Sequence, residues 1–430
     1  MRAIVAVAAA LCLLVLWPAV AGAHAVLLRA TPSSSESLTA PPQQVQLLFS
    51  EPLDPVFSHV EVTDASGLQV DTGDSHLDPQ DDRLLAVSLR AGLPNGIYTV
   101  VWRSLSAIDV HPDQGQYPLF VGVPVTRQNV ATSSLDTTAT PETTFGRWWF
   151  YVAASLFGGV LATWKLALAP ALEDSDPSLH NRVHRRALRL VLLGGALLIV
   201  GTLFSAVAQA ASAANVPLGQ AFGQPLADLL LRGRFAAIWW PRVGLEVASL
   251  LLIAAGGIDG LASECALATL PAVLLTSALT SHGAALPGSA GLGIAIDWLH
   301  IVGATAWVGG LVALAAILPV ARSLAISSVL TRFARVVLIA SMAVLLSGVL
   351  QGTLEVGSLS GLLGTPYGEL VLIKSALILA MLGLASWNEW RRRAASLAGL
   401  QRGVAAELAL GVVVFGVAAV LSGTPPTPTV

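Results

Sequence analysis

Eight long apolar stretches in the last two thirds of the chain limit its folds more than any other feature. They cover residues 147–169, 187–211, 236–257, 262–281, 293–319, 334–353, 368–389 and 404–422. Each is long enough to cross the roughly 30 Å hydrocarbon core of a bilayer as a helix. The 430 residues are 54% hydrophobic and only 11% charged, which is unlike any soluble domain. The sequence therefore predicts an all-α, polytopic membrane bundle of eight transmembrane helices over residues 146–430.

The arginines between these stretches predict which loops lie inside. If the chain before the first helix is exported, most loop arginines fall on the inner side: Arg182, Arg185, Arg186, Arg189, Arg322, Arg332, Arg391, Arg392, Arg393 and Arg402. Among the outer loops, only the one with Arg232 and Arg234 is basic. This asymmetry follows the positive-inside rule. We expect a multi-pass protein of the cytoplasmic (inner) membrane, with its N-terminal domain on the extracytoplasmic side.

Residues 1–23 have the pattern of a signal peptide. Arg2 precedes an apolar run, Ile4 to Trp17, that is too short to span, and Ala21-x-Ala23 provides the small residues needed for cleavage. The mature chain would then begin at His24 with a free α-amine. The amine and the imidazole Nδ1 of one histidine can chelate a single ion, and Cu(II) favours such nitrogen ligands. The alternative is that His24 is merely the first residue of the exported domain.

Residues 24–123 are predicted to form an exported all-β Greek-key sandwich or barrel. Short β-rich runs lie at 44–49, 59–63, 84–89, 96–103 and 116–123, with turn residues between them. Strands of this length and spacing are typical of a small sandwich of about 100 residues. Residues 124–145 then turn to Thr, Ser and Pro, a composition typical of a solvated linker.

Asp109 and His111 form a candidate ligand pair in this β-domain. They are two residues apart, so an extended backbone would place both side chains on one face, and Pro112 favours that conformation at His111. With the amine and imidazole of His24 they would supply three nitrogens and one oxygen, a tetragonal set suited to Cu(II). The alternative is an Asp-His pair in an exposed turn.

Composition narrows the remaining choices. Cys12 would leave with the signal peptide, and the single remaining cysteine, Cys265, lies in an apolar stretch, so a thiolate metal site is excluded within one mature chain. The net charge of −3 argues against nucleic acid as a partner. No phosphate-binding Walker motif is present, which argues against ATP hydrolysis by this chain.

The exported segment resembles the CopC family of periplasmic copper-binding proteins. The resemblance rests on the start His24-Ala-x-Leu, on Phe49-Ser-Glu-Pro52, and on Trp102-Arg-x-x-Ser-x-x-Asp109-x-His111-Pro-x-x-Gly115. It implies a cupredoxin-like fold that binds Cu(II) through His24, Asp109 and His111. Val110 is a departure, because members of the family usually carry Gly there.

Polar residues in the apolar stretches give a second set of candidates, because such residues are costly in a membrane. His282 lies at the outer end of the fourth stretch, and His300 lies about two turns inside the fifth. Asp297 shares a helix face with His300, and Gln351 and Glu355 in the sixth stretch are placed to face them. The pattern also predicts an Arg242–Glu246 pair and isolated ionisable groups at Lys374 and Glu407. For each, a structural interhelical role is the alternative to a role in transport.

The membrane half resembles the CopD family, the integral membrane partner of CopC. The residues that carry the resemblance are Thr280-Ser-His282-Gly, Asp297-Trp-Leu-His300, Trp307-Val-Gly-Gly310, Thr365-Pro-Tyr-Gly368, Lys374 and Thr424-Pro-Pro426. The resemblance implies a fused CopC–CopD protein that handles copper at the membrane. Because His282 and His300 both fall on the side that faces the exported domain in the predicted topology, we expect them to be metal ligands.

We therefore expect a non-enzymatic copper protein. Its exported domain would capture Cu(II) and pass copper to the helices for import, with the copper ion, the bilayer and possible other copper chaperones as partners. Two alternatives remain open. One is a membrane-bound copper or haem oxidoreductase, because a helical bundle with two histidines can hold one haem. The other is a copper-binding resistance module without transport.

Overall fold

The structure is a computed structural model that describes residues 25–34, 36–124, 133–134, 139–173, 175–320, 326–391 and 397–426. The predicted signal peptide, His24 and most of the predicted linker lie outside the described residues. The chain divides into two compact units. One contains Gly22–Ala139 together with Gln209–Ala237, and the other contains Thr140–Ala208 and Ile238–Val430.

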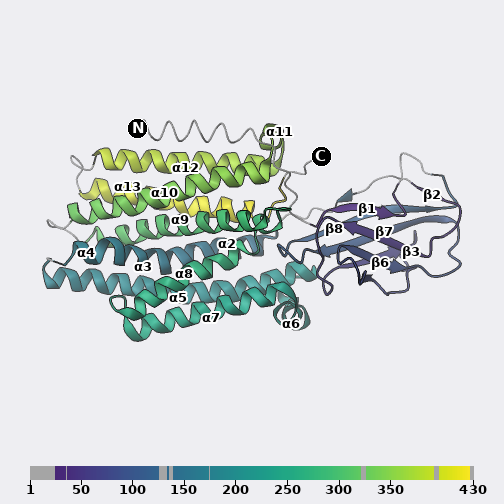
Figure 1. Cartoon of the computed structure of the whole chain (residues 1–430), viewed down its shortest axis with the longest axis horizontal. Helices are drawn as coiled ribbons and strands as arrows, with labels where there is room; N and C mark the ends of the chain where they lie inside the picture. The colour runs from purple at the N-terminus through teal and green to yellow at the C-terminus, as the bar shows by residue number, and fades with distance from the viewer. Residues whose placement is uncertain are drawn as a thin grey trace. The chain divides into compact units, whose positions relative to one another are not determined.

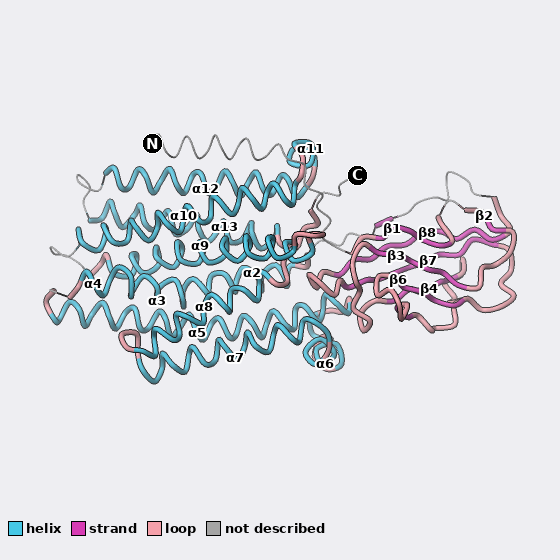
Figure 2. The backbone as a smooth tube through the Cα atoms, in the orientation of Figure 1, coloured by secondary structure: helices cyan, strands magenta, loops and turns pink. Residues whose placement is uncertain are grey.

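The first unit contains a β-sandwich of two sheets, as predicted, and the sheets do not close into a barrel (Figure 2). One sheet has the order β1-β3-β6-β5, with all neighbours antiparallel. Its strands are β1 (Leu27–Thr31), β3 (Gln44–Phe49), β5 (His76–Leu77) and β6 (Leu84–Ser88). The alternating residues Val45, Leu47 and Phe49 of β3 are fully buried, so this sheet turns one face to the core.

The second sheet has the order β2-β8-β7-β4, and β9 also pairs with β8. Its strands are β2 (Ser37–Leu38), β4 (His59–Thr63), β7 (Gly96–Leu105), β8 (Pro112–Val121) and β9 (Ser133–Ser134). The long hairpin β7–β8 places Leu105 opposite Pro112 at its closed end. The six residues between these two strands hold Asp109 and His111, two of the three predicted ligands of this domain.

The register of this hairpin explains why the Trp102–Gly115 motif ends in a glycine. Trp102 of β7 pairs with Gly115 of β8, and a Cβ at Gly115 would run into the indole ring of Trp102. The indole packs against Tyr117, with 6.2 Å between ring centroids. Glycine is therefore required at residue 115 because the tryptophan fills the space that a side chain would take.

The described residues contain eight helices that are long and apolar enough to cross a membrane, as predicted. The first span is continuous from Pro141 to Ala171 and consists of α2 (Pro141–Ala154), η1 (Ser155–Gly159), α3 (Val160–Thr163), η2 (Trp164–Leu168) and α4 (Ala169–Ala171). The others are α5 (Pro177–Ala214), α7 (Gly233–Gly256), α8 (Leu261–Ala278), α9 (Ala290–Ile317), α10 (Ile326–Val356), α12 (Pro366–Arg391) and α13 (Leu397–Leu421). Their axes run close to parallel (Figure 1).

Short helices connect the long ones. They are η3 (Leu218–Gln220), α6 (Gln224–Leu231), η4 (His282–Ala285) and α11 (Leu359–Gly364). Helix α2 begins at Pro141, inside the predicted linker, because the Thr140 side chain accepts a hydrogen bond from the Thr143 N–H and caps the helix.

The unit that contains Thr140–Ala208 and Ile238–Val430 is called the membrane unit below, because it holds most of the long apolar helices. Helix α9 lies at its centre. It packs against η1, α3, α8, α10 and α13, and it carries both Asp297 and His300. Its crossing with the first span is tight at Gly159 and Gly309, where a Cβ on either residue would meet the backbone of the other helix. Small residues at such crossings let two membrane helices approach closely.

Candidate metal-binding sites

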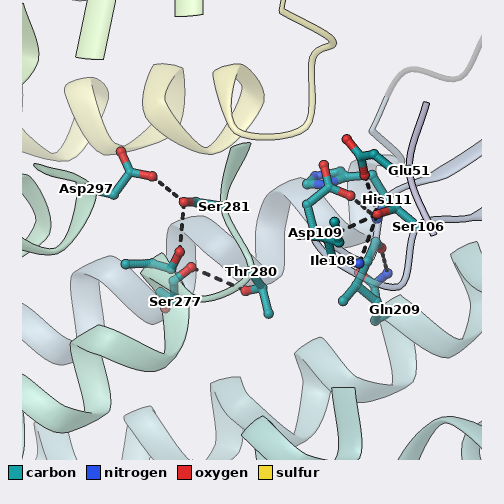
Figure 3. A network of polar contacts seen from close by, with 12 residues as sticks. Glu51, Ser106, Ile108, Asp109, His111, Gln209, Ser277, Thr280, Ser281 and Asp297 are labelled. Atoms are coloured by element: carbon teal, nitrogen blue, oxygen red, sulfur yellow. Dashed lines mark hydrogen bonds and ion pairs between the residues drawn. The ribbon is translucent and has the colours of Figure 1, made fainter. Parts of the chain in front are cut away.

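The candidate site of the sandwich is the turn between β7 and β8, and the hydroxyl of Ser106 organises it. Ser106 Oγ accepts hydrogen bonds from the N–H groups of Ile108 at 3.0 Å and Asp109 at 3.3 Å. It donates in turn to Glu51 Oε2 at 2.6 Å (Figure 3). All three polar side chains, Glu51, Ser106 and Asp109, are buried. The turn is thus held by a charge-assisted bond from a neighbouring segment.

Asp109 and His111 meet within this turn. His111 Nδ1 lies 3.0 Å from Asp109 Oδ2, and the His111 N–H donates to Asp109 Oδ1 at 3.1 Å. Both side chains are buried, which differs from the exposed Asp-His pair considered as the alternative. The arrangement offers an imidazole and a carboxylate, which are ligand types that Cu(II) accepts.

The backbone conformation predicted for this pair is wrong. Residues 107–109 form a turn, and Val110 has φ of +62°, in the left-handed region. An extended segment would have pointed both side chains to one face, whereas here the left-handed residue reverses the chain and brings them together. A glycine at this position would fit the same geometry, because glycine adopts positive φ without steric cost.

The residues that follow His24 are bonded to Ser50, the neighbour of Glu51. Ala25 is fully buried. The Val26 N–H donates to Ser50 Oγ, and the Ser50 N–H donates to the Val26 carbonyl, both at 2.9 Å. Ser50 precedes Glu51, the acceptor of the Ser106 hydroxyl. His24 itself lies outside the described residues, so its predicted role stays a prediction.

In the membrane unit, the structure places Gln351 and Glu355 beside Asp297, as predicted. The Gln351 amide donates to Asp297 Oδ1 and, at 3.3 Å, to Glu355 Oε1. Ser281 Oγ donates to Asp297 Oδ2 (Figure 3), and the Tyr367 hydroxyl donates to Glu355 Oε2. One amide thus bridges two buried carboxylates, and each carboxylate also accepts a hydrogen bond from a hydroxyl group.

Lys374 completes this polar network. It is partly buried on α12 and lies close enough to Asp297 and Glu355 to interact electrostatically with both. It is therefore not the isolated charge that the sequence predicted. A lysine near two carboxylates offsets part of the cost of keeping them in a membrane.

His282 and His300 are both buried but have different neighbours. His300 Nδ1 is 3.0 Å from Ser347 Oγ on α10, next to Gly348, where a Cβ would lie 3.3 Å from the imidazole. His282 begins η4, and its ring lies 6.3 Å from the Tyr367 ring, centroid to centroid. His282 therefore adjoins the Asp297–Glu355 network through Tyr367, while His300 shares α9 with Asp297.

Other predicted polar residues have structural partners. Arg242 donates to the hydroxyls of Thr276 and Ser277 and lies over the Phe150 ring. Glu246 Oε1 accepts from Thr202 Oγ1 at 2.9 Å. Arg242 and Glu246 also interact electrostatically with each other, as predicted for this pair.

The predicted isolated carboxylate Glu407 and three other histidines can be located in the structure. Glu407 accepts from the Asn388 amide and is not isolated. His184 Nε2 lies 2.9 Å from Asp259 Oδ2, and the ring packs against Trp164. His59 and His76 of the sandwich are exposed.

Several residues that shape these sites were not assigned a role from sequence. Glu51 and Ser106 lie in the motifs that carry the resemblance, so the motifs themselves were the available signal. Arg103 also lies in one of these motifs, whereas Gln209 had no such signal, because the residue that it contacts lies about 100 positions away in the chain. Tyr367 lies in the motif Thr365-Pro-Tyr-Gly368, but spacing alone does not pair it with Glu355.

Comparisons with known proteins match both halves of the chain. The CopC domain family matches residues 27–122, and the family described as Copper resistance protein D matches residues 327–421. Copper transport protein CutJ of Bacillus subtilis (strain 168) is 29% identical over 435 residues, which cover 96% of this chain and 76% of that protein. Protein YobA of Escherichia coli (strain K12) is 34% identical over 99 residues, or 23% of this chain and 79% of that protein.

Two solved structures match the sandwich segment. CopC from Methylosinus trichosporium OB3b is 30% identical and PcoC, a methionine rich copper resistance protein from Escherichia coli, is 32% identical. Each match covers 23% of this chain, with 93% and 99% of the two solved chains and TM-scores of 0.20 and 0.21. The matched segment 27–122 contains Asp109 and His111, and the matched segment 327–421 contains Gln351, Glu355 and Lys374.

Proposed function

Because the chain carries a CopC domain and a CopD domain, and so belongs to both families in one polypeptide, we propose that it captures Cu(II) outside the membrane and imports copper. The observation that supports this most directly is the buried Asp109–His111 pair, 3.0 Å apart, in the turn of the CopC domain. Copper is the cargo in this proposal, and the sandwich is its receptor.

The exported site would be formed by His24, Asp109 and His111. The mature α-amine and the His24 imidazole would chelate the ion, and Asp109 and His111 would complete a nitrogen-rich tetragonal set. The rigid support of the turn by Ser106 and Glu51 favours tight binding, because little side-chain freedom remains to be lost.

The role of His24 as the mature N-terminus can be tested by adding one residue before it. An Ala inserted between Ala23 and His24 and retained after cleavage removes the α-amine from the imidazole without changing the sandwich. We expect Cu(II) affinity to fall by orders of magnitude, measured by competition with a chelator of known affinity. Unchanged affinity would remove the His24 amine from the site.

In the membrane unit we propose that His282 and His300 receive the copper ion. Both are buried imidazoles in or next to the central α9 region, and neutral imidazole binds copper in either oxidation state. The hydrogen-bonded carboxylates Asp297 and Glu355 would stabilise a cation in this part of the membrane unit, where an isolated cation is otherwise costly.

The copper content of cells with and without the protein tests the function itself. Import predicts more copper in expressing cells, and efflux would give less. Equal copper content, with Cu(II) binding intact in the purified protein, would leave a binding module without transport. A Soret band in the purified protein would instead indicate haem and an oxidoreductase.

A further inference from the structure

The compact unit of the sandwich includes a segment from much later in the chain. Residues Gln209–Ala237 belong to this unit and contain the last turns of α5, η3, α6 and the start of α7. Two side-chain contacts join this segment to the hairpin β7–β8. One ends at the turn that holds Asp109 and His111, and the other is made by Arg103 of β7.

The first contact is a hydrogen bond from Gln209 to the turn. Gln209 Nε2 donates to the Val110 carbonyl at 2.7 Å (Figure 3). Val110 is the residue between the two candidate ligands, so this bond fixes the orientation of the peptide group that links Val110 to His111. Gln209 is partly buried, which limits exchange of this bond with water.

The second contact anchors the helix end that carries Gln209. Arg103 of β7 donates from Nε to the Ala213 carbonyl at 3.0 Å and from Nη2 to the Ser212 carbonyl at 2.5 Å. Carbonyl groups in the last turn of a helix lack intrahelical partners and carry partial negative charge. Burial lowers the pKa of Arg103 to about 10, so the guanidinium stays charged at neutral pH and holds the helix end.

The conformation of Val110 explains why the turn needs such support. Val110 has φ of +62° and is buried, and left-handed backbone is unfavourable for a β-branched residue. Such conformations persist where surrounding contacts over-determine them. The Gln209 bond is a contact of that kind, because it acts on the carbonyl of the strained residue itself.

We propose that Gln209 is a positioning residue of the exported copper site. Anchored by Arg103, it holds Val110 in the left-handed conformation that places the Asp109 carboxylate beside the His111 imidazole. This inference rests on the proposed function, since it assumes that Asp109 and His111 bind copper. It assigns to a residue 98 positions beyond His111 in the sequence a part in shaping that site.

The test uses the full-length purified protein with Gln209→Ala and Gln209→Glu. Glutamate keeps the size of the side chain but has no N–H to donate, so both variants lose the bond. We expect Cu(II) affinity to fall about two- to tenfold in each, the range of one net hydrogen bond. The electron paramagnetic resonance spectrum of bound Cu(II) should broaden or shift, and amide exchange of residues 106–111 should quicken in the copper-free protein.

A matched control separates positioning from general stability. Gln220→Ala makes the same change at an exposed side chain in the same segment and should leave all three measurements as in wild type. Wild-type affinity, spectrum and exchange in both Gln209 variants would overturn the inference. So would an equal loss in Gln220→Ala, because the effect would then not belong to the Val110 contact.

Combining the variants with Val110→Gly tests the physical reason. Glycine adopts positive φ without steric cost, so Gln209→Ala should lower Cu(II) affinity less in the Val110→Gly background than in wild type. An equal or larger loss would overturn the role of the strained conformation. If instead His111→Ala leaves affinity unchanged in otherwise wild-type protein, the proposed copper site fails, whereas an intact His111 effect with no Gln209 effect rejects this inference alone.

Discussion

At the scale of single residues, the turn that holds Asp109 and His111 is supported by the Ser106 hydroxyl and the Glu51 carboxylate, neither of which is a predicted ligand. Ser106 Oγ accepts hydrogen bonds from two backbone N–H groups of the turn and donates one to the Glu51 carboxylate. A buried carboxylate acceptor strengthens such a bond and is costly to leave unpaired. The two motifs that contain Glu51 and Ser106 are thus joined by one hydrogen bond.

The candidate ligands should differ in what they contribute. Asp109→Asn keeps an oxygen that can still accept from the His111 N–H, so the turn should persist and Cu(II) affinity should fall moderately. His111→Ala removes a nitrogen ligand, which should lower Cu(II) affinity more than the loss of one negative charge does. Chelator competition on the full-length variants measures both. A larger loss for Asp109→Asn than for His111→Ala would contradict this ligand set.

Acid stability of the sandwich should depend on Asp74. Hydrogen bonds from the Ser88 side chain, the Ser88 N–H and the Thr72 hydroxyl lower the pKa of Asp74 from 3.8 to about 2. A lowered carboxylate pKa contributes stability that is fully present above the unfolded value of 3.8 and is lost as pH falls toward 2. Part of the resistance to acid therefore comes from this one side chain.

Asp74→Asn removes this pH dependence, because an amide does not titrate. In wild type, amide exchange of β5 and β6, corrected for the intrinsic pH effect, should quicken between pH 4 and pH 2. In Asp74→Asn the corrected exchange should be faster at pH 5 and change less with acid. Asp82→Asn, at an exposed carboxylate, is the control. Identical pH profiles for wild type and Asp74→Asn would contradict the assignment.

At the scale of elements, the sequence predicts what has a clear period. The strands at 44–49 and 59–63 begin and end where predicted, and eight apolar helices follow. The two-residue strands β2, β5 and β9 were missed because a pairing of two residues leaves no alternation to detect. The turn at Val110 was missed because a left-handed backbone is unusual for a β-branched residue, so the local propensity of valine did not indicate it.

The crossing of α9 with the first span gives a prediction for an element. A Cβ at Gly309 would meet the backbone of Gly159 and Ser155, so Gly309→Ala must push the two helices apart. Overpacking of this kind costs about 1–3 kcal/mol. Thermal unfolding in detergent should therefore begin at lower temperature than in wild type.

The control for this change is another glycine of a long helix. Gly383 of α12 has no atom within 4 Å of the place where a Cβ would lie, and alanine is the better helix former. Gly383→Ala should leave the unfolding temperature unchanged or raise it. If Gly309→Ala and Gly383→Ala behave alike, the crossing is not as close as the structure has it.

At the scale of the whole molecule, chain order and compact units do not coincide. Residues 209–237 follow the first membrane span in sequence yet belong to the unit that contains the sandwich. No periodicity or motif predicts that this segment joins the sandwich, because the association depends on contacts between residues about 100 positions apart, such as Arg103 with Ala213. The domains predicted from sequence, residues 24–123 and 146–430 with a linker between them, assign this segment to the membrane half.

The last prediction separates capture of copper from its passage. His282→Ala combined with His300→Ala removes two buried imidazoles of the membrane unit and leaves Asp109 and His111 in the chain. Chelator competition on the purified double variant should still find the tight Cu(II) site of the sandwich. Copper accumulation by expressing cells should nevertheless fall toward that of cells lacking the protein, because the ion has lost its imidazole ligands in the membrane unit.

His59→Ala with His76→Ala is the matched control, since it also removes two imidazoles but from exposed positions of the sandwich. It should accumulate copper like wild type. Equal accumulation in the His282–His300 variant and wild type would show that these histidines are structural and that copper takes another path. Asp297 and Glu355 would then be tested first, because the Gln351 amide joins these two buried carboxylates in the same membrane unit.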